Sequence, residues 1–250
     1  NILPNAFKLR DYAMAFFTRD DISLYYEVHG EGYPILLIAP GGMRSAVSFW
    51  QGSEWNPITT LAPHFRVIAM DQRNAGQSKG PVSGNDGWHS YTEDQLALLD
   101  HLGIEKAHVL GGCIGGPYAF GLMQAAPDRI TAAVLQQSIG FDGTNRPLMY
   151  DMFDSWKEGL KRDMPDVTDA EWATFRGNMY DGDFDFNVGR DFVATCQVPM
   201  LVLMGNDAYH PMQTSREIAE IAPKATLIED WKSEPDNTAR SVIAFLQHHA

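Results

Sequence analysis

The stretch Val109-Leu110-Gly111-Gly112-Cys113-Ile114-Gly115-Gly116 joins two different patterns of apolar residues. The segment from 107 to 110 is short and mostly apolar, as in a buried strand, whereas apolar residues recur with helical spacing from 114 to 126. A strand that turns abruptly into a helix brings two backbone segments together, which leaves no room for a Cβ beside the turn. Gly111 and Gly115, two residues before and after Cys113, satisfy this condition. We therefore predict a strand, a tight turn at Cys113 and a helix.

The residue at this turn has nucleophilic chemistry. Gly111-x-Cys113-x-Gly115 matches the nucleophile-elbow pattern G-x-S-x-G, with cysteine in place of serine. A thiol held at a helix N-terminus has a lowered pKa, which favours the reactive thiolate. The alternative interpretation is that the glycines only allow close packing and that Cys113 is a small buried hydrophobic residue.

The composition limits the possible partners. The 250 residues include 19 basic and 32 acidic side chains, which gives a net charge of −13 and a pI near 4.9. Nucleic acid and anionic membranes are not expected partners, because both require a basic face. No apolar run approaches the length of a membrane span, and the first residues show no signal-peptide pattern. The two cysteines lie in contexts that do not suggest a structural pair, which predicts a cytoplasmic protein. No spacing typical of a metal or nucleotide site occurs, so we expect neither a metal nor a cofactor. We expect the partner to be a small molecule.

The order of the elements predicts an α/β fold with a doubly wound, mainly parallel sheet. The uninterrupted apolar run at 35–38 is typical of a strand that is buried on both faces. We expect helices at 92–102, 114–126 and 213–221 and a last helix ending at 248. Strands are expected at 13–18, 22–29, 35–38, 65–70, 107–110, 130–137, 199–204 and 225–229. Ligands of such sheets bind at the carboxyl ends of the strands, where Cys113, Gly42 and Asp207 would lie.

The pattern changes between 140 and 189, where aromatic residues and methionines replace strand patterns. Thr168 and Glu171 form a capping box that predicts a helix toward Tyr180. We interpret 140–189 as a helical cap inserted in an α/β core of residues 1–139 and 190–250. Its aromatic side chains either form the core of the cap or, in part, line an apolar pocket, for which Trp156 is a candidate.

The polar segment at 71–78 follows a predicted strand and contains Asp71 and Arg73. Carboxylate and guanidinium groups in such a turn hydrogen-bond to backbone groups and to each other. We expect both residues to have this structural role, with Asp71 and Arg73 paired.

Four segments resemble the α/β-hydrolase fold superfamily over about residues 13–248. They are Pro40-Gly41-Gly42-Met43, the turn from Asp71 to Ser78, the elbow at Cys113, and Gly205-x-Asp207-x-x-His210-Pro211. The resemblance implies that Cys113 is the nucleophile and that Asp207 is the acid after the seventh strand. It also implies an oxyanion hole formed by the backbone N–H of Ile114 with that of Gly42 or Met43.

The chain departs from this superfamily at the catalytic histidine. The histidine is usual in the loop after the last strand, where this sequence has Asp230-Trp231-Lys232-Ser233-Glu234. We expect His210 to be the base instead, with His89 and Lys232 as further candidates. Alternatively, His210 only begins the helix that follows it. Arg44 and Trp231 are candidate substrate-binding residues, although Arg44 could be an ordinary surface side chain.

These observations support one leading hypothesis and two alternatives. In the first, the Cys113 thiolate attacks a small, mostly apolar ester, lactone or thioester, and water or an acceptor then takes the acyl group. The missing histidine motivates the second, a lyase, isomerase or decarboxylase that uses the oxyanion hole to hold an enolate. The third is a ligand-binding protein on a catalytically inactive scaffold, since a fold alone does not determine function.

Overall fold

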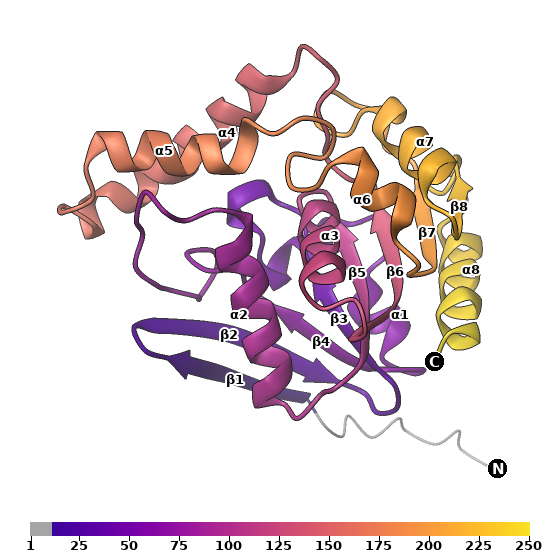
Figure 1. The fold of residues 1–250 in the computed structure, drawn as a ribbon. Coiled ribbons are helices and arrows are strands. Elements are labelled where there is room, and N and C mark those ends of the chain that lie inside the picture. The colour runs from indigo at the N-terminus through magenta and orange to yellow at the C-terminus, as the bar shows by residue number, and fades with distance from the viewer. Residues whose placement is uncertain (1–11) are drawn as a thin grey trace.

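The computed structural model describes residues 12–250, which include an eight-stranded sheet in the order β1-β2-β4-β3-β5-β6-β7-β8 (Figure 1). β1 and β2 pair antiparallel, β2 pairs antiparallel with β4, and the remaining pairs are parallel. The predicted mainly parallel sheet is therefore confirmed. The strands are β1 (Tyr12–Arg19), β2 (Ile22–His29), β3 (Pro34–Ile38), β4 (Arg66–Met70), β5 (Ala107–Gly112), β6 (Ile130–Gln136), β7 (Met200–Leu203) and β8 (Ala225–Ile228).

Helices cover both faces of this sheet. The α-helices are α1 (Pro57–Leu61), α2 (Trp88–His101), α3 (Gly115–Ala125), α4 (Arg146–Leu160), α5 (Asp169–Tyr180), α6 (Arg190–Thr195), α7 (Met212–Ile221) and α8 (Pro235–His248). Three 3-10 helices are η1 (Gly42–Arg44), η2 (Val47–Gly52) and η3 (Lys161–Asp163) among the described residues. α2 begins earlier than expected because the Ser90 hydroxyl accepts a hydrogen bond from the N–H of Gly87, which starts a turn ahead of the leucine stripe.

Each face of the sheet contributes to a separate core. Leu36 and Ile38 of β3 pack into the core under α2, α3 and α7, whereas Ile35 and Leu37 pack into the core under α1 and α8. Successive strand residues point to opposite faces, so a strand that is covered on both faces needs the uninterrupted apolar run seen in β3. Cys113 belongs to the first core.

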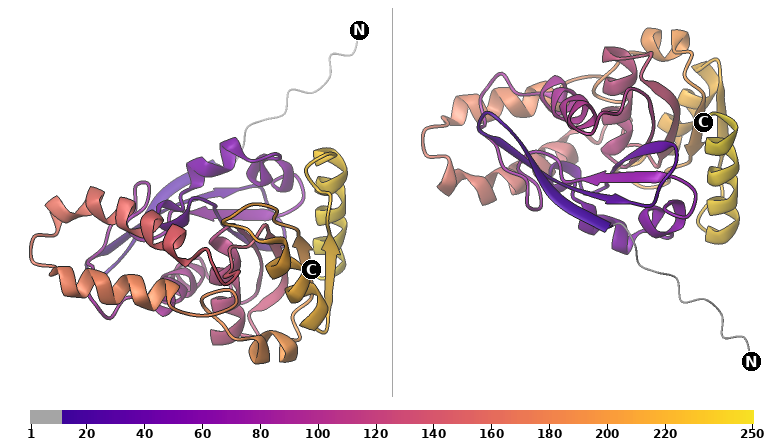
Figure 2. Two further views of the ribbon diagram at one scale, coloured as in Figure 1. Left: turned by 90° about the horizontal axis from the view of Figure 1, so that it is seen from above. Right: turned by 90° about the horizontal axis from the view of Figure 1, so that it is seen from below.

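The helices α4 and α5, which lie in the region 140–189 that we interpreted as a cap, follow β6 and come before β7 in the chain. Figure 2 shows them side by side, projecting beyond the sheet on the side away from α8. Phe153 lies 5.3 Å from Trp156 and 5.2 Å from Phe175 between ring centroids. These rings form the core of the helix pair, as one of the two interpretations predicted. The cap also contacts the sheet edge, because a Cβ on Gly42 would lie 2.2 Å from Met152 Sδ.

The turn after β4 is held by Asp71, whose carboxylate accepts backbone N–H groups of Val47 and Gln77 at 2.7 Å each. The expected pair between Asp71 and Arg73 is wrong. Arg73 instead donates to Asp94 on α2 at 2.8 Å from both Nε and Nη2, because the Asp71 oxygens are already occupied by backbone donors.

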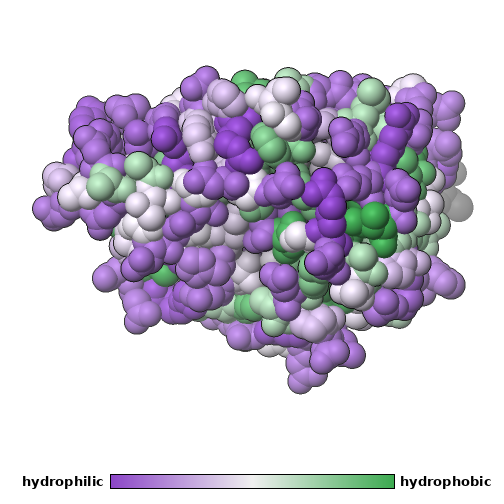
Figure 3. Space-filling view, turned by 45° about the horizontal axis from the view of Figure 1, so that its top comes forward, coloured by the Kyte–Doolittle hydropathy of each residue, from purple (hydrophilic) through white to green (hydrophobic). Residues whose placement is uncertain are grey.

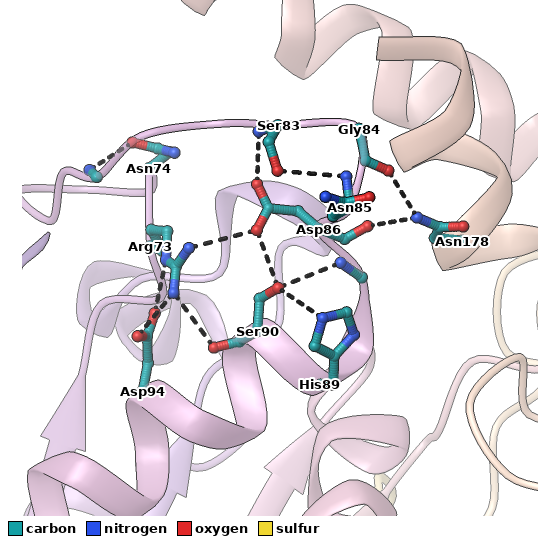
Figure 4. Close-up of polar contacts among 12 residues, drawn as sticks. Arg73, Asn74, Ser83, Gly84, Asn85, Asp86, His89, Ser90, Asp94 and Asn178 are labelled. Atoms are coloured by element: carbon teal, nitrogen blue, oxygen red, sulfur yellow. Dashed lines mark hydrogen bonds and ion pairs between the residues drawn. The ribbon is translucent and has the colours of Figure 1, made fainter. Parts of the chain in front are cut away.

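Arg73 also approaches Asp86 at 3.4 Å in the segment that precedes α2 (Figure 4). Asn178 of α5 donates to the carbonyl oxygens of Gly84 and Asp86 at 3.0 and 2.8 Å. The side-chain amide of Asn178 thereby joins the cap to the same segment that Arg73 holds (Figure 4).

Candidate active site

Cys113 lies between the end of β5 and the start of α3, with a backbone φ of +59°. A positive φ is unusual for a residue with a Cβ and indicates strain at the turn. A Cβ on Gly111 would lie 2.0 Å from the Gly115 carbonyl oxygen, and one on Gly115 would lie 2.5 Å from the Ile38 carbonyl oxygen. Both contacts are with backbone and cannot relax cheaply, so the two predicted glycines are required by the turn.

His210 and Asp207 lie in the loop between β7 and α7. Nδ1 of His210 is 2.8 Å from Asp207 Oδ2, and the other carboxylate oxygen accepts the backbone N–H groups of Tyr209 and His210 at 2.9 and 3.0 Å. The imidazole is therefore fixed by a carboxylate from its own loop. Because Nδ1 contacts Asp207, Nε2 is the nitrogen left for the reaction.

Nε2 of His210 is buried and makes no hydrogen bond of ordinary geometry within residues 12–250. The imidazole interacts instead with the Cys113 thiol. Burial lowers the pKa of His210, but the neighbouring sulfur and Asp207 outweigh this effect and raise it to about 9. A histidine that is protonated at neutral pH beside a sulfur favours the thiolate form of that sulfur.

The thiol of Cys113 responds in the opposite sense. Burial raises its pKa, yet the imidazole of His210 and the backbone N–H groups of Gly41 and Gly42 together bring the pKa below its usual value. For Asp207, burial likewise raises the pKa, and His210 lowers it on balance. The three groups therefore favour an arrangement of thiolate, imidazolium and carboxylate.

The loop after β3 places two consecutive backbone N–H groups near the sulfur. Gly41 and Gly42 have φ values of +118° and +58°, a left-handed pair that directs successive N–H groups to one side. Gly42 was predicted as part of the oxyanion hole, whereas Gly41 was not. The sequence shows the glycine pair but not its backbone angles, which decide which amide faces Cys113. Met43 is buried in the first core, and Ile114 leads into α3.

The other candidate residues are engaged by partners other than Cys113. Arg44 donates to the Ser155 carbonyl oxygen at 2.7 Å and so holds the cap to η1. Trp156 is buried in the cap and donates to the Asn74 carbonyl oxygen at 2.9 Å. Trp231 packs in the second core, on the face of the sheet opposite to Cys113.

The two further base candidates also have other partners. Lys232 lies 3.6 Å from Glu54, and a ring nitrogen of His89 is 3.5 Å from the Ser90 hydroxyl (Figure 4). Of the three candidate bases, the geometry therefore brings His210 to the candidate nucleophile.

The molecular surface near the site is partly apolar. Seen with the top of Figure 1 turned forward, the surface is mainly hydrophilic and carries small hydrophobic patches (Figure 3). Cys113 is only 8% exposed, so the sulfur is almost covered. Exposed large hydrophobic side chains in residues 12–250 include three from segments next to the site: Phe49, which packs on Gly41, and Tyr209 and Met212, which flank His210.

Residues 12–250 hold neither a metal-binding cluster nor a membrane span. No group of three His, Cys, Asp or Glu side chains in this range is placed to hold a metal ion. No helix of the same range has the length and apolar character needed to cross a membrane.

A family model described as the alpha/beta hydrolase fold matches residues 34–171, more than half of the chain. The chain belongs to the α/β-hydrolase fold family. The matched region contains the glycine loop, the Asp71 turn and the Cys113 elbow, which are three of the four segments that carried the resemblance.

Relatives in this family include two proteins named carbamate hydrolase RutD. The one from Azorhizobium caulinodans is 40% identical over 118 residues, which are 46% of this chain and 41% of that protein. The one from a Caulobacter species is 26% identical over 91% of this chain and 97% of its own length.

Solved structures of α/β-hydrolases share the fold. A variant of the meta-cleavage product hydrolase CumD from Pseudomonas fluorescens superimposes with a TM-score of 0.69 at 22% identity, over 92% of this chain and 96% of that one. An enol-lactonase from Burkholderia xenovorans gives 0.70 at 22% identity, over 93% and 100%.

Proposed function

We propose that the chain is a hydrolase or acyltransferase in which the Cys113 thiolate attacks the carbonyl carbon of a small, mostly apolar ester, lactone or thioester. The observation that carries this proposal is the chain of contacts from Cys113 through His210 to Asp207. The imidazole raises the thiolate population of Cys113, and the carboxylate orients the imidazole. Relatives named as hydrolases support the same class of reaction.

The proposed reaction has two halves. The sulfur forms a bond to the carbonyl carbon, and the oxygen becomes an oxyanion held by backbone N–H groups of the Gly41–Gly42 loop, with Ile114 and Met43 as further proposed donors. The tetrahedral intermediate then expels the alcohol or thiol, which takes the proton of the His210 imidazolium. The product is an acyl-thioester on Cys113.

In the second half, His210 is neutral and acts as a general base. It removes a proton from water or from an acceptor alcohol or thiol, which attacks the acyl-thioester and regenerates the thiolate and the imidazolium. The near burial of Cys113 limits the access of bulk water, which strengthens the electrostatic interactions at the sulfur.

The replacement Cys113→Ala tests the proposal. We expect it to abolish both turnover of p-nitrophenyl esters and labelling by iodoacetamide. Cys196 offers a matched control, because it is also free and buried and burial raises the pKa of its thiol. The variant Cys196→Ala should keep both properties. Undiminished turnover in Cys113→Ala would exclude a cysteine nucleophile.

Mass spectrometry after mixing with an activated ester separates this proposal from the alternatives. An acyl group on Cys113 is expected for hydrolysis or acyl transfer. A lyase or isomerase that only stabilises an enolate would carry none. The main motive for that alternative was the lack of a base, and His210 now supplies a candidate.

A further inference from the structure

Two tyrosine hydroxyls near the candidate nucleophile have no hydrogen-bond partner of ordinary geometry. Within residues 12–250, Tyr118 Oη and Tyr180 Oη are buried and unpartnered in this sense, and both side chains have 0% exposure. Tyr118 lies on α3, in the core, whereas Tyr180 is the last residue of α5, in the cap. Leaving a buried hydroxyl without a partner is costly, so such a group requires an explanation.

Both tyrosines lie within electrostatic range of the sulfur. A negative charge on Cys113 raises the pKa of each phenol, in addition to the larger effect of burial, and Tyr118 is also influenced by Tyr180. Tyr91 interacts with the Tyr118 hydroxyl, but without the geometry of a full hydrogen bond. A further unpartnered polar atom near the sulfur is His210 Nε2, which the proposed reaction uses. The two hydroxyls have no part in that reaction.

The surroundings of the two hydroxyls are aromatic. The ring of Trp88 lies 5.1 Å from Tyr118 and 6.1 Å from Tyr180 between centroids. Its indole N–H donates to the Met179 carbonyl oxygen and so does not pair with either hydroxyl. Burial raises the pKa of Tyr118. The groups that raise this pKa further are all acids: Tyr91, Tyr180, Asp94 and Cys113.

The sign of these charges limits what the hydroxyls can bind. A carboxylate would be repelled by the thiolate and by Asp94, and none of the charged groups that act on the two hydroxyls within residues 12–250 is a cation. The Arg73 guanidinium is already occupied by Asp94 and Asp86. The His210 imidazolium is likewise paired with Asp207 and with the thiolate. A neutral oxygen acceptor carries no such penalty and can accept from a tyrosine O–H.

We infer that the acyl group of the substrate carries a second, neutral oxygen acceptor, such as a ketone, ester or ether oxygen, which binds the hydroxyls of Tyr118 and Tyr180. This inference rests on the proposed function, because it assigns the two hydroxyls to the acyl part of a Cys113 substrate. Oxo- or alkoxy-acyl esters and thioesters are then better substrates than plain alkanoyl ones. Because Tyr180 belongs to the cap, the acceptor also links the bound substrate to α5.

Matched substrates test this inference directly. The p-nitrophenyl ester of hexanoic acid is compared with esters that carry a ketone on the fourth or the fifth carbon. We expect kcat/KM to be about tenfold higher for at least one keto ester. Tyr118→Phe and Tyr180→Phe should each lower this preference about three- to tenfold.

A third tyrosine provides the control. Tyr150 belongs to the cap, but its hydroxyl is already bonded to Asp181, so Tyr150→Phe should leave the preference unchanged. Circular dichroism of each variant checks that it folds. No preference for either keto ester, or an equal loss of activity on all three esters, would overturn the inference.

Calorimetry separates this inference from the proposed function. If hexanoate is hydrolysed without any preference for a ketone, the proposed function stands and the inference is wrong. If no ester is turned over, the inference is tested by comparing the calorimetric affinities of the keto and plain esters. Tighter binding of a keto ester that disappears in both phenylalanine variants would support the inference alone, whereas equal binding would overturn it.

Discussion

The His210 imidazole is held by Asp207, three residues earlier in the same loop, with 2.8 Å between Nδ1 and Oδ2. The superfamily pattern takes the histidine from the loop after the last strand, where this chain has Trp231. The Trp231 indole donates to the Met204 carbonyl oxygen at 2.8 Å, directly after β7. A side chain from the loop where the superfamily histidine is usual therefore supports the loop that carries Asp207 and His210.

Replacement of Asp207 by asparagine should impair His210 as the proposed base. The amide keeps an oxygen for the backbone N–H groups of Tyr209 and His210, but it removes the charge that stabilises the imidazolium. We expect a loss of roughly 10²- to 10⁴-fold in kcat, measured with p-nitrophenyl esters. Asp230→Asn is the matched control, since Asp230 caps a surface turn through Ser233. Full activity in Asp207→Asn would show that this carboxylate does not assist catalysis.

The pH dependence of Cys113 alkylation should depend on His210. In the native chain the imidazole lowers the pKa of the thiol, so iodoacetamide labelling should persist below the pH range of an ordinary cysteine. His210→Gln leaves burial as the main influence, which raises the pKa and should move the labelling curve to higher pH. Superimposable labelling curves for the two proteins would contradict the assignment.

Catalysis should have a separate upper limit in pH. The pKa of His210 is raised to about 9, so the imidazolium is present below that value and disappears as the pH rises through it. Because the leaving group takes its proton from this imidazolium, kcat/KM should fall above about pH 9, even though the thiolate persists. A rate profile that keeps rising past pH 9 would be inconsistent with His210 as the acid.

Local chemistry explains why much of this architecture was predictable. The apolar run in β3 and the glycines around Cys113 reflect demands of their own immediate backbone, which are visible in a few residues of sequence. The same holds for Asp207 and His210, whose spacing places both in one loop. In each case the residues that interact are close neighbours in the chain.

The errors arose where the partner is distant in the sequence. Arg73 pairs with Asp94 on α2 rather than with Asp71, because backbone N–H groups compete for the Asp71 oxygens. Tyr118 and Tyr180 come from α3 and α5, and the position of both rings beside Trp88 depends on how these distant segments pack. No local pattern distinguishes them from ordinary buried aromatic residues.

The elbow glycines should be far less tolerant than other glycines. Gly115→Ala places a methyl group 2.5 Å from the Ile38 carbonyl oxygen and should lower the free energy of unfolding by about 2 kcal/mol or more. Gly189→Ala is the control, because nothing lies within 4 Å of the place that its Cβ would take and its φ is −84°. Urea unfolding of the two variants measures the difference, and equal stabilities would argue against a tightly packed elbow.

Asp185 should make the stability of the fold depend on pH. It lies between Phe184 and Phe186, which have φ values of +61° and +72°. One carboxylate oxygen accepts the N–H groups of Asn187 and Val188 at 3.0 and 2.7 Å, while the other has no partner within residues 12–250. Burial raises the pKa of Asp185 to about 7 against the opposing effect of these hydrogen bonds.

The direction of the effect follows from proton uptake. Between about pH 4 and 7 the folded chain keeps a proton on Asp185 that the unfolded chain has lost, so stability is greatest at the acidic end and falls as the pH rises toward 7. The amide introduced by Asp185→Asn stays neutral and keeps an oxygen for both N–H groups. The variant should therefore be more stable than the native chain at pH 8, by on the order of 1–4 kcal/mol.

Thermal unfolding at pH 5 and pH 8 tests this expectation. The native Tm should fall between the two values, and Asp185→Asn should reduce that fall. Asp142→Asn is the control, because Asp142 also accepts backbone N–H groups but its pKa is lowered, so it is ionised throughout this range. If Asp185→Asn and the native chain lose the same stability between pH 5 and pH 8, the buried carboxyl group is not the source of the pH dependence.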